Sequence, residues 1–323
     1  MIDMEQDGLN QTTISLLCNV SPPTVSRYVV ANNLQPLNQD NKKNHKFSIE
    51  STRKIVRGVG HLEKKKIQKK KFIFYNFKGG VGKTSMCFQI SSHMALMGYK
   101  VLVIDADPQS HLSTSLGFSY ENNYLTLYDM IVRGVPFNDV KKSIFEGFDC
   151  IPSNLSLTRL EDDLAKMENK LERISLCFAD IEKEYDFIFV DTNPTISLLN
   201  RNLVIFTDII NVICETQPYS LNGLKLLLED LEKFYIHMNL KPREINIIPN
   251  KYEDRSSSSA EAMTALRRYY SRYIKEDFAI RKSEDINTSA KLGKPLALFV
   301  KKNSIALADM VELIHYFIEK YTI

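Results

Sequence analysis

Cysteine is scarce in this chain of 323 residues, and long apolar runs are absent from it. No Cys-x-x-Cys pair occurs, so the sequence indicates neither a zinc site nor a disulfide framework. The five cysteines are Cys18, Cys87, Cys150, Cys177 and Cys214. We expect them to be reduced and to pack as apolar side chains, as in a cytoplasmic protein. Without a run of about 18 apolar residues, no transmembrane helix is expected. The acidic N-terminal stretch MIDMEQDGLN lacks the basic and apolar regions of a secretory signal.

The positive charge is concentrated at one end of the chain. Residues 1–71 contain 13 lysines and arginines and six acidic residues, a net charge of +7 in a chain of net charge +3, so the remainder carries −4. This asymmetry indicates that the basic end meets a polyanion, although the stretch EKKKIQKKK (63–71) by itself is better explained as a solvated linker. The length suits two domains. We divide the chain into a head (1–60), a basic linker (61–71) and a body (72–323).

Two short helical patterns follow one another in the head, in QTTISLLCNVSPPTVSRYVVANNL (11–34). Ser21 suits the N-cap of the second helix, and Pro22 suits its first turn. This spacing is typical of a helix-turn-helix, whose second helix enters the major groove of DNA. We expect Ser21, Pro22, Ser26 and Arg27 to face the DNA, with Arg27 reaching a guanine edge or a phosphate.

A basic segment completes the head. NKKNHKFSIESTRKIVRGVG (41–60) indicates a hairpin followed by a helix, and Lys42, Lys43 and Lys46 could contact the DNA backbone as a wing. The whole head resembles the winged helix-turn-helix of MerR-type regulators, without the effector domain of that family. The alternative is an ordinary helical hairpin, because helix-turn-helix patterns also arise by chance.

Strand and helix patterns alternate through the body. Short apolar runs separated by helical patterns predict an α/β domain with a mostly parallel sheet flanked by helices. The predicted strands are 71–76, 100–105, 186–191, 208–214 and 244–249. Two of the predicted helices are 83–98, ended by Gly98, and 221–238.

The stretch FKGGVGKTS (77–85) lies between a predicted strand and a predicted helix, where a phosphate-binding loop belongs. Phe77 occupies the position of the usual first glycine, and a second lysine, Lys78, follows it. The backbone N–H groups of the next residues can still turn inward around phosphate oxygens, and the helix N-terminus adds its dipole. These residues are Gly79, Gly80, Val81 and Gly82. Lys83 would reach the β- and γ-phosphates, and Thr84 would bind Mg²⁺ through its hydroxyl.

Carboxylates follow two other predicted strands. Asp105 and Asp107 stand at the end of VLVIDADPQ, and Asp191 ends FIFVD. Acidic residues at strand C-termini beside a phosphate-binding loop fit Mg²⁺ binding and the positioning of water. Taken one at a time, each is better explained as a loop acid or a helix cap, and only together with the loop do they indicate a site.

Three motifs together resemble the ParA/MinD family of deviant Walker ATPases. They are KGGVGKTS, IDADPQSHLSTSLG and FVDTNPTISLLNRNLVIFTDIINVICE. The ParA branch is most similar, and LGKPLALFVKKNSIALADMVELIHYF (292–317) also resembles the C-terminal segment of that branch. The resemblance covers about 72–323, and the head resembles the operator-binding addition of the larger ParA proteins.

The resemblance implies a P-loop NTPase fold, ATP and Mg²⁺ as cofactors, and an ATP-sandwich homodimer. Lys78 would be the signature lysine that reaches the ATP of the partner subunit, while Asp107 would orient the attacking water. Asp105 and Asp191 would support Mg²⁺, mostly through water. Ser85 would contact the α-phosphate, and Asn250 would contact the adenine.

One motif departs from the family pattern. The usual Asp-x-Pro-Pro is here Asp191-Thr192-Asn193-Pro194, so one proline is lost.

The function implied is that of a DNA-partition ATPase. ATP would drive a dimer that binds DNA non-specifically, and a ParB-like centromere-binding protein would stimulate hydrolysis. The head would bind operator DNA and repress its own operon. The protein would be cytoplasmic and associated with the nucleoid. Candidate cations for non-specific DNA binding are Arg281, Lys282, Lys291 and Lys294.

Three other functions compete. A repressor regulated by ATP would use the same residues. A MinD-like membrane positioner needs a basic amphipathic tail, whereas LADMVELIHYFIEKYTI is not basic and predicts a packed terminal helix, so no membrane partner is expected. An iron–sulfur relative needs paired cluster cysteines, which the sequence lacks.

Overall fold

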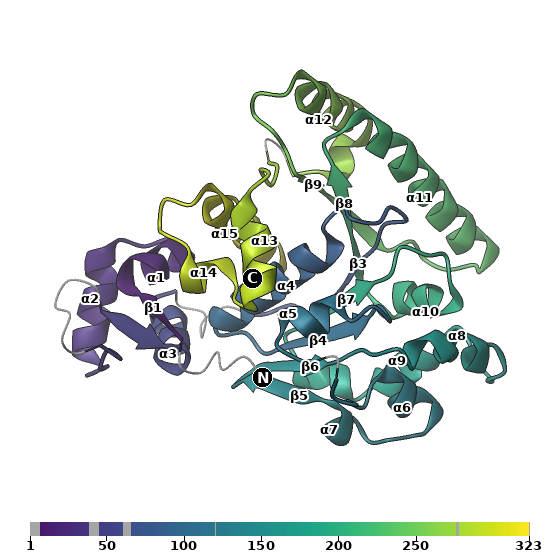
Figure 1. Cartoon of the computed structure of the whole chain (residues 1–323), viewed down its shortest axis with the longest axis horizontal. Helices are drawn as coiled ribbons and strands as arrows, with labels where there is room; N and C mark the ends of the chain where they lie inside the picture. The colour runs from purple at the N-terminus through teal and green to yellow at the C-terminus, as the bar shows by residue number, and fades with distance from the viewer. Residues whose placement is uncertain (1–6, 39–44, 61–65, 120, 276–277, 323) are drawn as a thin grey trace.

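A seven-stranded sheet forms the centre of the body. The computed structural model describes residues 7–38, 45–60, 66–119, 121–275 and 278–322 (Figure 1). The strand order is β5-β6-β4-β7-β3-β8-β9, and every neighbouring pair is parallel except the antiparallel pair β5 and β6 at one edge. The strands are β3 (Lys70–Phe74), β4 (Val101–Ala106), β5 (Lys142–Phe145), β6 (Phe148–Ile151), β7 (Phe187–Thr192), β8 (Ile209–Glu215) and β9 (Glu244–Asn250). The predicted α/β fold with a mostly parallel sheet is confirmed.

The five predicted strands are β3, β4, β7, β8 and β9, each within two residues of its predicted bounds. These strands could be predicted from the sequence because both faces of a central parallel strand are buried, so its sequence is almost continuously apolar. The edge hairpin of β5 and β6 was not predicted. Its strands have four residues each, and the outer one is only partly buried, so neither carries a long apolar run.

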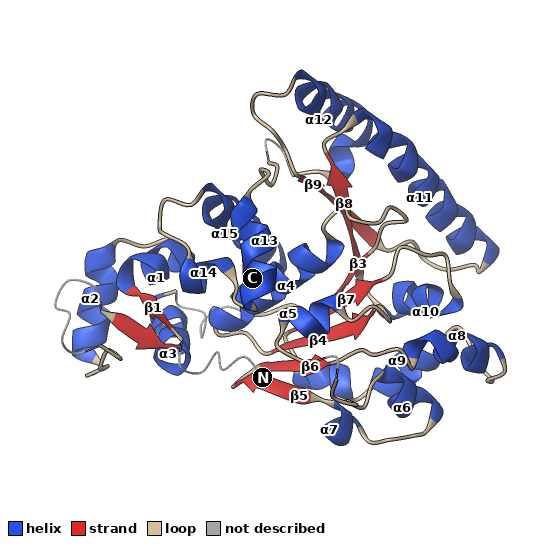
Figure 2. Ribbon diagram, in the orientation of Figure 1, coloured by secondary structure: helices blue, strands red, loops and turns tan. Residues whose placement is uncertain are grey.

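Helices cover both faces of the sheet (Figure 2). Side chains of α4, α5, α14 and α15 build the hydrophobic core on one face, and those of α6 to α12 build the core on the other. The helices are α4 (Lys83–Leu96), α5 (His111–Ser115), α6 (Leu127–Val132), α7 (Phe137–Val140), α8 (Leu157–Ala165), α9 (Arg173–Phe178), α10 (Leu198–Phe206), α11 (Pro218–His237), α12 (Ser257–Tyr270), α13 (Glu284–Leu292), α14 (Leu296–Phe299) and α15 (Ile305–Tyr321), with 3₁₀ turns at Ile181–Glu184 and Ser271–Tyr273.

Within its described residues, 7–38 and 45–60, the head contains three helices and a two-stranded antiparallel sheet. Its elements are β1 (Gly8–Asn10), α1 (Gln11–Cys18), α2 (Pro22–Ala31), β2 (Lys46–Ser48) and α3 (Ile49–Val59). Asn10 caps α1 by accepting from Thr13 N at 2.8 Å, and Ser48 caps α3 by accepting from Ser51 N at 3.1 Å. Ser21 precedes α2 as predicted, but its hydroxyl pairs with Thr24 Oγ1 instead of capping the backbone.

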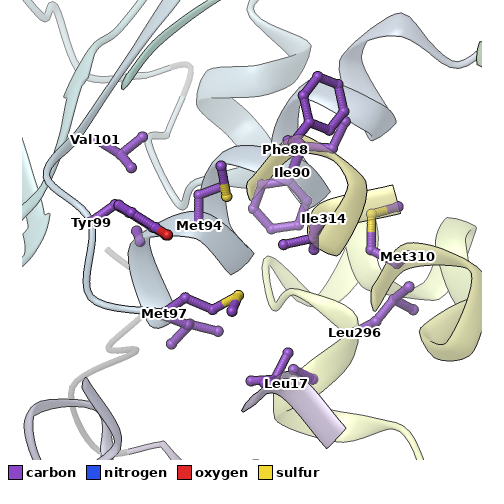
Figure 3. Close-up of a cluster of buried hydrophobic side chains, with 14 of the residues drawn as sticks. Leu17, Phe88, Ile90, Met94, Met97, Tyr99, Val101, Leu296, Met310 and Ile314 are labelled. Carbon is purple, nitrogen blue, oxygen red and sulfur yellow. The ribbon is translucent and has the colours of Figure 1, made fainter. Parts of the chain in front are cut away.

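The head and the body share one hydrophobic core. Leu17 of α1 lies in the same cluster as Leu296, Met310 and Ile314 of the body (Figure 3). His315 of α15 contacts the Leu17 carbonyl at 2.8 Å. The head therefore packs firmly beside α13 to α15, with α2 on its outer side (Figure 1).

Arg53 of α3 forms the polar centre of this union. It is 7% exposed, and its guanidinium donates to the carbonyl oxygens of Ala95, Tyr99 and Gly98, the last two at 3.3 and 3.4 Å. These carbonyls lie at the end of α4, so the cation also meets the negative end of that helix dipole. Burial lowers the pKa of the Arg53 guanidinium.

The segment predicted as a linker is partly structured. Residues 61–65 lie outside the described part of the chain, while Ile67 bridges Thr322 and β3 begins at Lys70. The predicted terminal helix is α15, whose apolar residues pack into the shared core. Within the described residues, the structure has no helix with the length and hydropathy needed to cross a bilayer.

Candidate nucleotide-binding site

The sheet register brings the predicted acidic residues to the phosphate-binding loop. Phe74, the last residue of β3 before the loop, pairs with Asp191 of β7. Asp191 in turn pairs with Asp105 of β4. Because parallel strands end at the same edge of the sheet, both carboxylates lie beside the loop at the carboxyl edge, where α/β proteins bind ligands.

The loop between β3 and α4 has the backbone of a phosphate cradle. Gly80 and Gly82 have φ of 73° and 99°, which a side chain would strain. A Cβ on Gly82 would lie 2.5 Å from Asn250 Nδ2, so the site also leaves no room for one. Asn250 is 3% exposed, and its Nδ2 donates to the Val81 carbonyl at 2.8 Å. Asn250 thus braces the loop, and its predicted contact with adenine stays a prediction.

Phe77 does not disturb this cradle. Its ring is half-buried and packs edge-on against Tyr75, with 5.5 Å between the ring centroids. Lys78 N donates to Asn76 Oδ1 at 3.0 Å, which fixes the turn after the aromatic residue. The position of the usual first glycine therefore supplies packing here.

Lys83 and Thr84 start α4 inside the site. Lys83 is 6% exposed, and its Nζ donates to the Lys78 carbonyl at 3.4 Å. Burial lowers the pKa of Lys83, while Asp191 and Asp107 oppose that shift. Thr84 Oγ1 donates to Asp191 Oδ2 at 2.7 Å. Ser85, in the next position, is half-buried.

Asp191 fits a divalent cation best. It is fully buried, and its Oδ1 has no hydrogen-bond partner among the described residues. Burial raises its pKa well above the usual range, and the charge of Asp105 adds to that effect. Within the described residues no group of three or more His, Cys, Asp and Glu gathers as a metal site. A site with only a few protein oxygens suits Mg²⁺, because this ion keeps water molecules and phosphate oxygens as its other ligands.

Asp105 serves mainly to order the loop after β4. One carboxylate oxygen accepts from Ser113 N at 2.8 Å and from Ser113 Oγ at 2.7 Å, and the other accepts from Asp107 N at 3.1 Å. Burial raises the pKa of Asp105 to about 6, although these hydrogen bonds act in the opposite direction. Ser113 was not predicted, and its only signal in the sequence is the Ser/Thr-rich turn after DADPQ.

Asp107 lies one residue beyond the end of β4 and is 9% exposed. Its Oδ1 accepts from Gln109 N at 2.9 Å, and its carbonyl accepts from Ser153 Oγ at 2.6 Å. The side chain is therefore held at the site by its own loop. This placement is compatible with the water-orienting role that was predicted for it.

Lys78 stands at the mouth of the loop with 43% of its side chain exposed. Its Nζ pairs with Glu215 Oε2 at 2.5 Å and lies 3.3 Å from Ser220 Oγ. Lys251 pairs with the other oxygen of Glu215 at 2.7 Å and donates to the Gly80 carbonyl at 2.6 Å. Glu215, Ser220 and Lys251 were not predicted as site residues. The signal for Glu215 is its place directly after the predicted strand 208–214, the same kind of position that identified Asp191.

The loop after β7 shows what replaces the lost proline. Asn200 Nδ2 donates to Asn193 O at 3.2 Å and to Thr195 O at 2.7 Å. Thr192 Oγ1 donates to Phe74 O at 2.7 Å, which joins the end of β7 to the end of β3, just before the two loops begin. Side-chain amide hydrogen bonds thus hold the turn that a second proline would stiffen.

Comparison with known proteins gives the family. The family model AAA_31, described as an AAA domain, matches residues 69–243. The chain belongs to this family of ParA/MinD-type P-loop ATPases. It is 31% identical to the cell division protein PomZ of Myxococcus xanthus over 69% of this chain and 70% of that protein. It is 27% identical to the chromosome partitioning protein ParA of Caulobacter vibrioides, over 69% and 85% of the two chains.

The ParA-type fold also appears among solved structures. A complex of Cyanothece McdA with ATP superposes with a TM-score of 0.69 at 22% identity, over 79% of this chain and 98% of that chain. At that identity the likeness concerns the fold. The family match begins at residue 69, so it does not include the head.

The predicted DNA-contacting residues lie in different surroundings. Ser21, Pro22 and Arg27 are exposed at the start of α2, while Ser26 is half-buried and its hydroxyl lies 3.1 Å from Gln11 Oε1. Lys46 is exposed on β2. Lys42 and Lys43 lie outside the described residues.

Three of the four body cations proposed for DNA already have carboxylate partners. Arg281 forms a two-pronged pair with Asp309, and Lys282 pairs with Glu253 at 2.8 Å. Lys294 pairs with Asp7 of the head at 2.7 Å, whereas Lys291 is exposed on α13. DNA phosphates would have to compete with these carboxylates. The predicted role of the four cations in DNA binding stays a prediction.

Proposed function

We propose that this chain is a DNA-partition ATPase that dimerises on ATP. The observation that carries the proposal is Lys78, a cation at the exposed mouth of a complete phosphate-binding loop. Because the loop already has Lys83 for its own phosphates, a second lysine at its mouth suits the phosphates of a second subunit. The family membership supports the ATPase activity, and the relative named as a chromosome partitioning protein supports the process.

ATP with Mg²⁺ is the proposed ligand of the site. Lys83 and the loop N–H groups would bind the β- and γ-phosphates, and Thr84 with the unpartnered Asp191 Oδ1 would hold Mg²⁺. Bound Mg²⁺ would neutralise charge on the phosphates. Asp107 would orient the attacking water, and Asp105 would keep the loop that carries Asp107 in place through Ser113.

Two lysine variants test the ATPase proposal. Lys83→Ala should abolish nucleotide binding or hydrolysis. Lys78→Ala should keep nucleotide binding but lose ATP-dependent dimerisation and turnover. Lys225→Ala is the matched control, because Lys225 is exposed on α11 and pairs with Glu229 of the same helix. Hydrolysis at the wild-type rate by Lys78→Ala would refute the role of Lys78 in trans.

DNA is the proposed partner of both parts of the chain. The head would bind operator DNA through α2 and repress its own operon, since α2 is on the outer side of the head with Arg27 exposed. The ATP-bound dimer would bind DNA non-specifically, associate with the nucleoid, and respond to a ParB-like centromere-binding protein. A titration of operator and random DNA with ATP, ADP or no nucleotide tests this. Equal random-DNA binding with ADP would contradict it.

A second function, a repressor regulated by ATP, is favoured by one feature of the structure. Helix α4 begins at Lys83 in the phosphate-binding loop. At its C-terminal end, the carbonyl of Ala95 accepts a hydrogen bond from Arg53 of the head. One rigid element thus joins the nucleotide site to the domain proposed to read DNA. Two results together would favour this function over partition. The rate of ATP hydrolysis would be the same with and without a ParB-like centromere-bound protein, and operator affinity would depend on the nucleotide.

A further inference from the structure

One carboxylate at the mouth of the phosphate-binding loop holds two lysines. Glu215 ends β8, the strand beside β3, and only 13% of its side chain is exposed. Its two oxygens pair separately with Lys78 at 2.5 Å and Lys251 at 2.7 Å. Such pairs at a partly buried site are stronger than exposed ion pairs.

The three charges belong to different elements that meet at the mouth of the loop. Lys78 is in the loop after β3, and Lys251 follows β9, whose Asn250 pairs with Glu215 in the sheet. Lys251 also donates to the Gly80 carbonyl inside the loop. Burial tends to raise the pKa of Glu215, but the hydrogen bonds from Lys251 and Lys78 outweigh it, and the net shift is downward. Glu215 is therefore ionised while it holds both lysines.

Both contacts of Lys78 Nζ are with residues of its own chain. Ser220 Oγ, 3.3 Å from Lys78 Nζ, adds a second contact in the same direction, toward β8 and α11. Lys251 has a φ of 56°, which is costly for a residue with a side chain and needs a compensating contact. Its ion pair with Glu215 and its bond to Gly80 provide that contact.

We propose that Glu215 is a positioning residue that retains Lys78 and Lys251 on their own subunit until the phosphates of a nucleoside triphosphate compete for them. The several negative charges of the triphosphate draw the lysines away from the single charge of Glu215. Lys78 is then released toward the nucleotide of the second subunit, and Lys251 remains beside Gly80 of its own loop. Because Lys78 must leave Glu215 before it can reach the second subunit, Glu215 raises the protein concentration needed for ATP-dependent dimerisation. This inference rests on the proposed ATP-dependent dimer.

Glu215→Gln tests the proposal, because the amide keeps the shape and loses the charge. We expect ATP-dependent dimerisation, measured by sedimentation at a series of protein concentrations, to have its midpoint at an about tenfold lower concentration, equivalent to about 1.4 kcal/mol. Glu229→Gln, which removes an exposed carboxylate on α11, should leave the midpoint unchanged. Ser220→Ala, a milder change, should shift the midpoint in the same direction by a smaller factor.

The Lys78→Ala background separates this inference from the proposed function. If Lys78→Ala and wild type dimerise equally with ATP, the proposed function fails. If Lys78→Ala loses dimerisation, the ATP affinity of the monomer still reports on Lys251, which lies beside Gly80 of the loop. The double variant Lys78→Ala/Glu215→Gln should then bind ATP severalfold more tightly than Lys78→Ala, because Lys251 no longer pairs with Glu215. Glu215→Gln and Ser220→Ala proteins that unfold like wild type yet dimerise at the same or a higher concentration would overturn the positioning role.

Discussion

Arg53 permits a sharp prediction about how the head is held. In Arg53→Met the apolar stem is kept, and the guanidinium that donates to Ala95, Tyr99 and Gly98 is removed. The acceptors are carbonyls at the end of α4, and the substitution leaves them buried without this donor. The variant therefore isolates the polar part of the union between head and body.

The magnitude follows from the contacts. A hydrogen bond to a charged group contributes about 1.5–3 kcal/mol. Ala95 O keeps a bond from Gly98 N at 3.0 Å, and Gly98 O keeps one from the Arg57 guanidinium at 3.5 Å, so the cost of about 1–3 kcal/mol for a buried acceptor without a donor applies to Tyr99 O alone. The bonds to Tyr99 and Gly98, at 3.3 and 3.4 Å, are long and count for less than the bond to Ala95. Burial of the guanidinium is itself unfavourable, as the lowered pKa of Arg53 shows. Removing Arg53 also removes this cost, which offsets part of the loss. We expect a net loss of about 3 kcal/mol in the free energy of unfolding.

Urea unfolding followed by circular dichroism measures this loss, and hydrogen exchange shows where it falls. Protection of α1 and α3 should decrease more than that of β3 and β7. Lys54→Met is the control, because Lys54 is exposed on the same helix and pairs with the exposed Glu50, so its urea midpoint should stay close to that of wild type. If Arg53→Met and Lys54→Met have the same urea midpoint and exchange, Arg53 does not hold the head.

Three further predictions follow from the site and the head. Gly82→Ala should weaken ATP binding at least about tenfold, because Gly82 has a positive φ and a Cβ there would meet Asn250. Gly134→Ala is the control: Gly134 has a φ of 67° but open space around it, so ATP affinity should be unchanged. Equal ATP affinities of the two variants would contradict the packing argument. The raised pKa of Asp105, about 6, means that the folded state binds this proton more tightly than the unfolded state, so stability falls as pH rises from about 4 to about 6. In urea unfolding without Mg²⁺, Asp105→Asn should therefore gain about 2 kcal/mol over wild type between pH 4.5 and 7, and a difference independent of pH would refute the assignment. Arg27→Ala should weaken operator binding by about 1–3 kcal/mol if Arg27 contacts a base, and an unchanged operator affinity would show that Arg27 does not read the DNA sequence. Binding of wild type to random DNA with ATP should fall steeply as the salt concentration rises.

The nucleotide site was largely predictable because its signals are local. FKGGVGKTS places phosphate-binding N–H groups and Lys83 within one short segment, and the acidic residues follow apolar strands that are easily recognised. A parallel sheet then brings strand ends together without further information. Asp105, Asp191 and Thr84 therefore lie together as the motifs indicate, although the oxygens of Asp105 accept from Ser113 and Asp107.

The partners of these residues were not predictable in the same way. Glu215, Ser220 and Lys251 reach Lys78 and Gly80 from β8, α11 and the end of β9, and these contacts span 137, 142 and 171 positions of the chain. Glu215 follows an apolar strand, but the sequence does not say which residues it pairs with, and Ser220 and Lys251 carry no local signal of a site. Only the strand order β3-β8-β9 makes them neighbours of the loop.

The sequence by itself determined the five parallel strands β3, β4, β7, β8 and β9, the phosphate-binding loop and the helical pattern of the head, because these depend on residues close together in the chain. It also suggested a separate head on a solvated basic linker. Only the tertiary structure decided that Leu17 and Arg53 join the head to α4, α14 and α15 in one core, and that Lys78 rests on Glu215. Both outcomes depend on packing and on charges brought together from distant segments, which no local pattern records.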